Sequence, residues 1–258
     1  MMVVRRIREH VTTHNWFAVV IDLAVVGIGV FLGIEAANWN QRRADRAEAA
    51  QYRLLIIDNL RANEADIAAR ISYYRQIRAH ALAALKAIQD SGTKLNNQFL
   101  VDAYQASQGW FRPLQRTAYD VPVAVGVRRE IGGMQSQSEL AAYQQFASGF
   151  DFNTLTVTGY RDRLRRDLDL RVQLAIRRDC DDIMRDLPGG AQAPQLPESC
   201  DLNLDPGLME QATRKLAAAP GLEQDLTRLI VDIDQKIGTF DRGLQAARRL
   251  RVRMETPA

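Results

Sequence analysis

The hydrophobic pattern at the start of the chain predicts a membrane-spanning helix. Residues 16–38 are almost entirely apolar, with the acid Asp22 inside the run and Glu35 near its end. An α-helix needs about 20 apolar residues to cross the hydrocarbon core of a bilayer. Trp16 and Trp39 stand at the two ends of the run, where indole rings prefer the membrane interface. We therefore predict a transmembrane anchor over residues 16–38, with Trp16 and Trp39 as interface anchors.

Two other interpretations of this run stay open: a buried core helix of a soluble protein, and a cleaved signal peptide. The run is longer than the roughly 7–15 apolar residues of a signal-peptide core. Its end, Ile34-Glu35-Ala36-Ala37, lacks a small residue at the −3 position that cleavage requires. An uncleaved anchor is therefore favoured.

One face of the predicted anchor combines its acid with small residues. At 100° per residue, Asp22, Gly29 and Gly33 fall within about 40° of one line along the helix. A Gly-x-x-x-Gly spacing lets two membrane helices approach closely. An intramembrane carboxylate costs about 2.5–3.5 kcal/mol unless it faces a partner or water. We predict that this face packs against a helix of a second copy or of another membrane protein.

Position allows a second interpretation of the same acid. Asp22 lies about 9 Å from Trp16 along the helix axis. From that depth its carboxylate also reaches the lipid headgroups without any protein partner. Glu35 points elsewhere and lies at the far interface, where we expect it to be solvated.

After the apolar run, the pattern changes to a stripe with steps of three and four residues. It contains no proline before Gly92, so it predicts one long helix that continues from the anchor and ends at Ser91-Gly92. Its apolar members are Ile67, Ile71, Tyr74, Ala81, Leu85 and Ile88. Because Glu64 and Arg78 also occupy the stripe, packing within one chain is at least as well supported as a coiled coil between chains.

The rest of the chain is also expected to be helical. We predict a short helix over residues 96–109, another from Ser138 and a third over residues 158–187. The apolar side of the third consists of Tyr160, Leu164, Leu168, Val172, Ile176, Ile183 and Leu187. Residues 117–133 fit either a strand, from the sequence VPVAVGV, or a short helix before a Gly-Gly turn. We favour the helix there.

The last predicted helix, over residues 222–253, has the most regular stripe. Its apolar positions are Leu222, Leu226, Leu229, Ile233, Ile237, Phe240, Leu244 and Ala247. Arginines at residues 248–253 suit the C-terminal end of the helix dipole, and we expect them to be solvated rather than bound to acidic lipid or an acidic partner. The predicted fold class is therefore all-α: a transmembrane helix that continues into a long helix, followed by a helical bundle.

The cysteines, and not the charges, indicate the orientation. The basic residues that flank the run are Arg5, Arg6 and Arg8 before it, and Arg42, Arg43 and Arg46 after it. Because this count is tied, the positive-inside rule does not choose a side. A disulfide between Cys180 and Cys200 would close a loop of about 20 residues, worth about 3 kcal/mol, and disulfides persist outside the cytosol. We therefore predict a cytoplasmic tail over residues 1–15 and a periplasmic domain over residues 39–258. Two separate buried thiols are the alternative.

No motif in the sequence predicts catalysis, a cofactor or a metal. A Gly-x-Ser-x-Gly elbow, a His-Glu-x-x-His helix and a phosphate-binding loop are all absent. His10 and His14 lack a third ligand, and His80 is expected to be a packing or surface residue. The acids of residues 179–186 alternate with arginines, which favours a solvated helix face over a calcium loop. The formal net charge of only +3 argues against a nucleic-acid partner. We predict a non-enzymatic protein without catalytic, cofactor-binding or metal-binding residues.

The segment WFAVVIDLAVVGIGVFLGIEAANWNQRRADR resembles a group of uncharacterised bacterial single-pass membrane proteins. In that group an N-terminal helix with an early acid and spaced glycines ends in Asn-Trp-Asn before charged residues. The segment TAYDVPVAVGVRREIGGMQSQSELAAYQQFASGF is similar to the group's middle block. It has Val121-Pro122 and Gly132-Gly133 where the group has an acidic-leucine pair and Ser-Ser-Gly. The resemblance implies an inner-membrane anchor with an exported helical domain, and it implies no activity.

These observations together predict an interaction or scaffold protein of the bacterial inner membrane. It would contact lipid and assemble through Asp22, Gly29 and Gly33, as a homo-oligomer or as an accessory subunit of a membrane complex. Two alternatives stay open. One is a periplasmic ligand-sensing module that acts through a partner, because a tail over residues 1–15 cannot hold an output domain. The other is a periplasmic enzyme.

Overall fold

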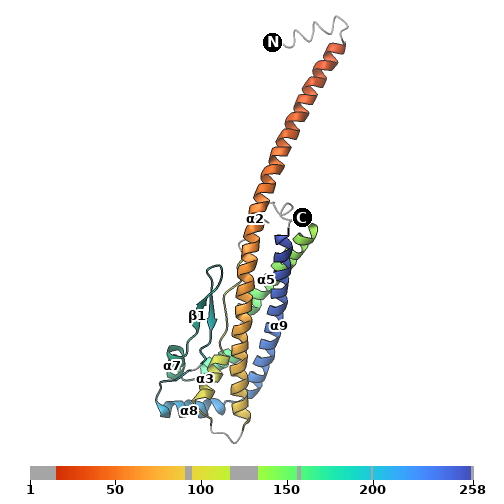
Figure 1. The fold of residues 1–258 in the computed structure, drawn as a ribbon. Helices are drawn as coiled ribbons and strands as arrows, with labels where there is room; N and C mark the ends of the chain where they lie inside the picture. Colours follow the sequence, from red (N-terminus) through yellow and green to blue (C-terminus); the bar gives the residue numbers. More distant parts are fainter. Residues whose placement is uncertain (1–15, 91–94, 117–132, 156–157, 199, 257–258) are drawn as a thin grey trace. The chain divides into compact units, whose positions relative to one another are not determined.

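The computed structural model describes residues 16–90, 95–116, 133–155, 158–198 and 200–256. Within these residues, seven helices account for 78% and strands for 4%, so the predicted all-α class is confirmed (Figure 1). The chain divides into two compact units, Met1–Gln51 and Tyr52–Ala258, called unit 1 and unit 2 below. The predicted membrane boundary after residue 38 stays a prediction.

Helix α2 (Trp16–Gln89) supplies residues to both units. Its unit 1 part confirms the predicted helix over residues 16–38, and the side chains of residues 19–44 are all exposed. This helix is long enough and apolar enough to span a membrane, and none of its most apolar window is buried. Trp16 and Trp39, the predicted interface anchors, are 77% and 61% exposed.

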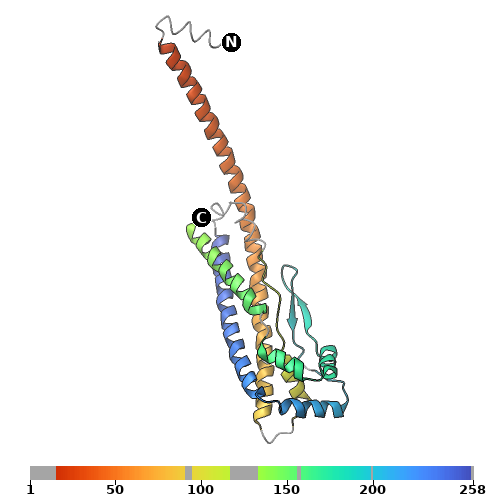
Figure 2. The ribbon, with the colours of Figure 1, turned by 180° about the vertical axis from the view of Figure 1, so that it is seen from behind.

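In unit 2, the second part of α2 lies antiparallel and side by side with α9 (Leu222–Glu255), as Figures 1 and 2 show. The predicted stripes of both helices are confirmed, because their apolar members are buried or half-buried in one core. The two polar residues in the α2 stripe reach α9 within the chain. Glu64 pairs with Arg251 at 2.6 Å, and Arg78 pairs with Asp234 at 2.6 Å. Packing within one chain is therefore the correct interpretation of this stripe.

Short helices complete the core of unit 2. They are α3 (Asn97–Ala106), α5 (Met134–Leu155), α6 (Gly159–Asp167), α7 (Leu170–Asp179) and α8 (Pro206–Ala217). Helices α5 and α6 pack on α9, whereas α3 packs on α7 and α8. Polar caps fix where several of them begin: Asn96 accepts from the backbone N–H of Phe99, and Asp205 accepts from that of Leu208. The predicted helix over residues 96–109 ends earlier, at Ala106, and the one expected from Ser138 begins at Met134.

The predicted single helix over residues 158–187 is wrong. It breaks at Leu168, because the side chain of Asp169 accepts a hydrogen bond from the backbone N–H of Arg171 and starts α7 as a new helix. Helix α7 then ends at Asp179. Ile183, predicted to lie on a buried helix face, is instead 48% exposed on a strand.

A β-hairpin occupies the chain between α7 and α8 and was not predicted. Strand β1 (Ile183–Asp186) pairs antiparallel with β2 (Gln192–Gln195). The turn contains Gly189 and Gly190, whose φ angles of 83° and 77° lie in the left-handed region that glycine adopts without strain. The Pro188-Gly189-Gly190 sequence therefore forms a hairpin turn.

Some predictions fall outside the described residues. They are the tail over residues 1–15 with His10 and His14, the helix end at Ser91-Gly92, and the choice between helix and strand over residues 117–132. Helix α2 ends just before the second of these segments, at Gln89.

Candidate functional site

Unit 1 carries the predicted packing face of α2. Asp22, Gly29 and Gly33 are all exposed. Apart from the nearby backbone of α2 itself, a Cβ atom added to Gly29 or Gly33 would meet no atom within 4 Å, so the helix surface there is open. Among the described residues, no hydrogen bond or ion pair engages the carboxylate of Asp22. This face is therefore apolar, with small residues at Gly29 and Gly33 and one acid, Asp22. No other element from the part of the chain that the structure describes packs on it.

The opposite side of the same segment differs from this face. Gly27 is equally open, but it lies about 140° around the helix from Asp22. Glu35, expected to be solvated, is half-exposed and forms an ion pair with Arg42 at 3.4 Å. The guanidinium of Arg43 lies 5.9 Å from the ring centre of Trp39. The acid near the end of the apolar run thus has a cation within the chain, whereas Asp22 has none among the described residues.

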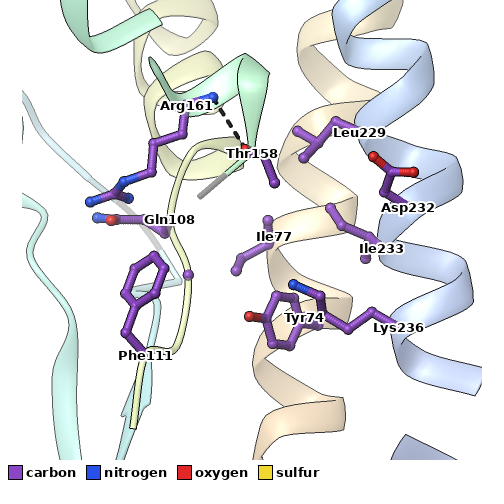
Figure 3. A pocket seen from close by; sticks show the side chains of 11 residues that line it. Tyr74, Ile77, Gln108, Phe111, Thr158, Arg161, Leu229, Asp232, Ile233 and Lys236 are labelled. Carbon is purple, nitrogen blue, oxygen red and sulfur yellow. Dashed lines mark hydrogen bonds between the residues drawn. The ribbon is translucent and has the colours of Figure 1, made fainter. Parts of the chain in front are cut away.

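A small cleft lies in unit 2 between α2, α9 and the segment after α3 (Figure 3). Its apolar floor includes Tyr74, Ile77 and Ile233. It encloses about 30 Å³, room for about two water molecules. Its cations are engaged within the chain: the ammonium of Lys236 lies 4.9 Å from the ring centre of Tyr74, and Arg161 donates to the carbonyl of Ser107 at 2.6 Å. The cleft as it stands is too small for a substrate-sized ligand.

A buried ionic cluster in unit 2 was missed by the sequence analysis. Arg70 is fully buried, donates to the carboxylate of Asp66 and donates to the carbonyl of Arg112 at 2.7 Å. Its guanidinium lies 4.6 Å from the ring centre of Trp110 and 5.1 Å from that of Phe150. Burial lowers the pKa of Arg70, and the hydrogen bond to Asp66 opposes that shift. The i,i+4 spacing of Asp66 and Arg70 is a local signal of their pairing, but their other partners come from distant segments of the chain.

The predicted disulfide between Cys180 and Cys200 is present, with the two Cα atoms 5.4 Å apart. Beside it, the hydroxyl of Tyr73 donates to the carboxylate of Asp182 at 3.0 Å. Burial raises the pKa of Asp182, although the hydrogen bond from Tyr73 lowers it in part. Burial also raises the pKa of Tyr73. Asp182 is therefore a docking residue of the segment that leads into the hairpin, and not part of the solvated helix face predicted for residues 179–186.

One further surface expectation needs correction, and the packing role expected for His80 has a specific partner. Two of the arginines at the end of α9 pair within the chain and are not simply solvated: Arg251 with Glu64, and Arg253 with Glu139 at 3.0 Å. His80 is half-buried, and its Nδ1 lies 2.8 Å from a carboxylate oxygen of Asp102 on α3. Both features hold helices of unit 2 together. Within the described residues, no group of three His, Cys, Asp or Glu side chains has the arrangement of a metal site.

No protein-family model, curated protein or solved structure matches this chain. The resemblance of the anchor segment to the group of bacterial membrane proteins therefore stays a prediction. The function has to be inferred from the chemistry of the chain itself. Among the described residues, the α2 face of Asp22, Gly29 and Gly33 is the place where an unpaired acid lies on an exposed apolar helix.

Proposed function

We propose that this protein is a membrane-anchored interaction protein that assembles through the α2 face of Asp22, Gly29 and Gly33. It acts as an oligomeric scaffold or an accessory subunit of a bacterial inner-membrane complex. The observation that carries the proposal is the carboxylate of Asp22, which has no partner among the described residues and sits in an apolar, exposed helix. A carboxylate at that depth is stabilised by a protein neighbour or by water.

The glycines give this neighbour room to approach. Beyond the nearby backbone of α2 itself, nothing lies within 4 Å of where a side chain at Gly29 or Gly33 would begin, so a second helix can pack its side chains directly on the α2 backbone there. Such close contact is the main source of association between membrane helices, because lipid tails are as apolar as the helices themselves. The other faces of residues 16–38 are apolar, which suits contact with lipid.

The proposed topology places residues 1–15 in the cytoplasm and residues 39–258 in the periplasm. The disulfide between Cys180 and Cys200 supports it, because disulfides are rare in the reducing cytosol. A reporter enzyme that works only in the periplasm, fused after Ala258, should be active. An inactive fusion, with an active one at the N-terminus, would reverse the topology.

The assembly proposal is tested by the native mass of the intact chain in mild detergent, with identification of every protein that co-purifies. We expect a defined homo-oligomer or a stable complex, and we expect the double variant Gly29→Leu with Gly33→Leu to dissociate it. Gly27→Leu is the matched control, because it adds the same side chain to the same apolar run on the other side of the helix. A lone monomer, or equal behaviour of the double variant and the parent chain, would contradict the proposal.

A further inference from the structure

The apolar run of a second copy offers Asp22 no cation. Residues 17–37 contain only two polar side chains, Asp22 and Glu35, and both are acids. The run has no Lys, Arg, His, Ser, Thr, Asn, Gln, Tyr or Trp side chain. If two copies packed in parallel through the glycine face, Asp22 would lie against Asp22. The two carboxylates would then carry like charges, which repel each other at short distance.

We propose that the face of Asp22, Gly29 and Gly33 binds a transmembrane helix of a different protein that carries a Lys or Arg side chain at the depth of Asp22. This inference rests on the assembly proposal and names its partner by charge complementarity. The matching depth is about 9 Å inside the interface that Trp16 marks. Charge-assisted hydrogen bonds are the strongest polar contacts available to a carboxylate. In the hydrocarbon core, such a hydrogen bond stabilises the carboxylate and the cation at the same time.

The packed part of the chain uses the same chemistry at three of its acids. Glu64 faces Arg251 of α9, and Asp234 of α9 faces Arg78. Asp66, buried in the core, accepts from Arg70. In each case the acid is held by an arginine from a packed neighbour or from its own helix. Asp22 is an acid on an apolar face whose cation is missing from the described residues.

The glycines make such a pairing geometrically accessible. Gly29 and Gly33 lie two and three turns beyond Asp22 on the same side of α2. Close approach of a partner helix at the glycines brings its backbone near α2. A long Lys or Arg side chain of that helix, at the depth of Asp22, then reaches the Asp22 carboxylate. The glycines and the acid therefore select the same partner helix. That helix has a smooth surface where it packs on the glycines and a Lys or Arg side chain at the depth of Asp22.

The test uses the full chain in bacterial inner membranes, with a designed leucine-alanine transmembrane helix as the probe. The probe carries one Lys at the depth of Asp22, and its matched control carries Leu there. Energy transfer between fluorescent tags measures association. We expect the Lys probe to associate roughly fivefold to thirtyfold more tightly than the Leu probe, the size of a polar contact between membrane helices. Asp22→Leu should remove this preference, whereas Glu35→Gln should keep it.

A charge reversal adds a gain-of-binding arm. The Asp22→Lys variant should no longer associate preferentially with the Lys probe. It should instead associate with a probe that carries Asp at the same depth. Equal association of the Lys and Leu probes with the parent chain would overturn the inference, as would a preference that survives Asp22→Leu. The first result is expected if Asp22 reaches the lipid headgroups.

The same assay separates this inference from the assembly proposal. If the glycine double variant abolishes association with every probe while Lys and Leu probes bind the parent chain equally, assembly through the face stands and the cationic partner fails. If the double variant has no effect either, both proposals fail. Gly27→Leu controls for added bulk in the run.

Discussion

Helix α2 provides a comparison within one element, because its unit 1 part and its unit 2 part both carry polar residues on an apolar face. In unit 2, Glu64 and Arg78 interrupt the apolar stripe, and each has a partner of opposite charge on α9. In unit 1, Asp22 interrupts an apolar run and has no partner among the described residues. The difference teaches that a polar residue on an apolar helix face marks where a neighbour belongs. In unit 2 the neighbour is supplied by the chain, and in unit 1 we infer that it comes from another protein.

The largest expected effect comes from removing a charge partner in the packed unit 2. Asp66→Ala leaves the fully buried charge of Arg70 without its carboxylate, and we expect the free energy of unfolding to fall by about 3–5 kcal/mol. Asp58→Ala is the control on the same helix, because Asp58 pairs with Arg61 at the surface and should cost less than about 1 kcal/mol. Denaturant unfolding of the full chain in detergent measures both. Similar losses for the two variants would show that the buried cluster is not a special support of unit 2.

The next effect concerns the disulfide. Replacing Cys180 and Cys200 together by Ala should lower the free energy of unfolding by about 3 kcal/mol, since the crosslink no longer restricts the unfolded chain. A reducing agent should destabilise the parent chain by a similar amount and leave the double variant unchanged. If the reductant also destabilised the double variant, the loss would not come from this bond.

A smaller effect compares glycines in packed and open surroundings. A Cβ on Gly243 would lie 1.8 Å from the ring of Phe146, so Gly243→Ala should destabilise unit 2 by roughly 1–2 kcal/mol in spite of its better helix propensity. Gly238→Ala, on the same helix, meets only the end of Arg242 at 3.7 Å and should stabilise by up to about 1 kcal/mol. Unfolding curves that shift in the same direction for both variants would contradict this contrast. In unit 1, Gly29→Ala should leave the unfolding of unit 2 unaffected.

The smallest effect is a pH dependence at Asp182. Because burial raises its pKa in the folded chain, the folded chain holds this proton more tightly than the unfolded chain does. The resulting stabilisation is complete below the unfolded pKa, near 4, and is lost as the pH rises through the folded pKa. The stability of the parent chain relative to Asp182→Asn should therefore fall across that window and then level off. Unfolding measured at a series of pH values tests this expectation.

Tyr73→Phe sharpens that measurement. It removes a hydrogen bond that lowers the pKa of Asp182, so the fall in relative stability should extend to higher pH. A parent chain whose stability tracks that of Asp182→Asn at every pH would show that this carboxyl does not titrate differently on folding.

Periodicity predicts those parts of the molecule that a single helix determines. The stripes of α2 and α9 and the shared face of Asp22, Gly29 and Gly33 follow from 100° per residue alone. The apolar spacing over residues 158–187 stays helical past Asp169 and Asp179, so it predicts one helix. In the structure a side-chain cap at Asp169 starts a new helix, and the disulfide-linked segment with the hairpin follows the end of that helix at Asp179. Strand β1 could not be predicted because all of its residues are exposed, so it lacks the alternation of apolar and polar residues that marks a half-buried strand.

Contacts between distant segments could not be predicted in the same way. The sequence identified Glu64 and Arg78 as exceptions in a stripe, but their partners on α9 depend on the tertiary fold. The cluster around Arg70 draws on α2, α5 and the segment after α3, and only packing brings Trp110 and Phe150 to its guanidinium. The candidate face in unit 1 was accessible to sequence analysis because it lies on one helix.

The antiparallel pairing of α2 with α9 has a consequence for how a cell makes this chain. Arg53 donates to the carbonyl of Met254, a residue 201 positions further along. At about 5–20 residues per second, α9 follows Arg53 out of the ribosome after about 10–40 s. For that interval the apolar stripe of α2 has been synthesised while the helix that covers it has not. A cell that produces this protein therefore has to shield half of a long helix from proteases and from other nascent chains until its last partner arrives.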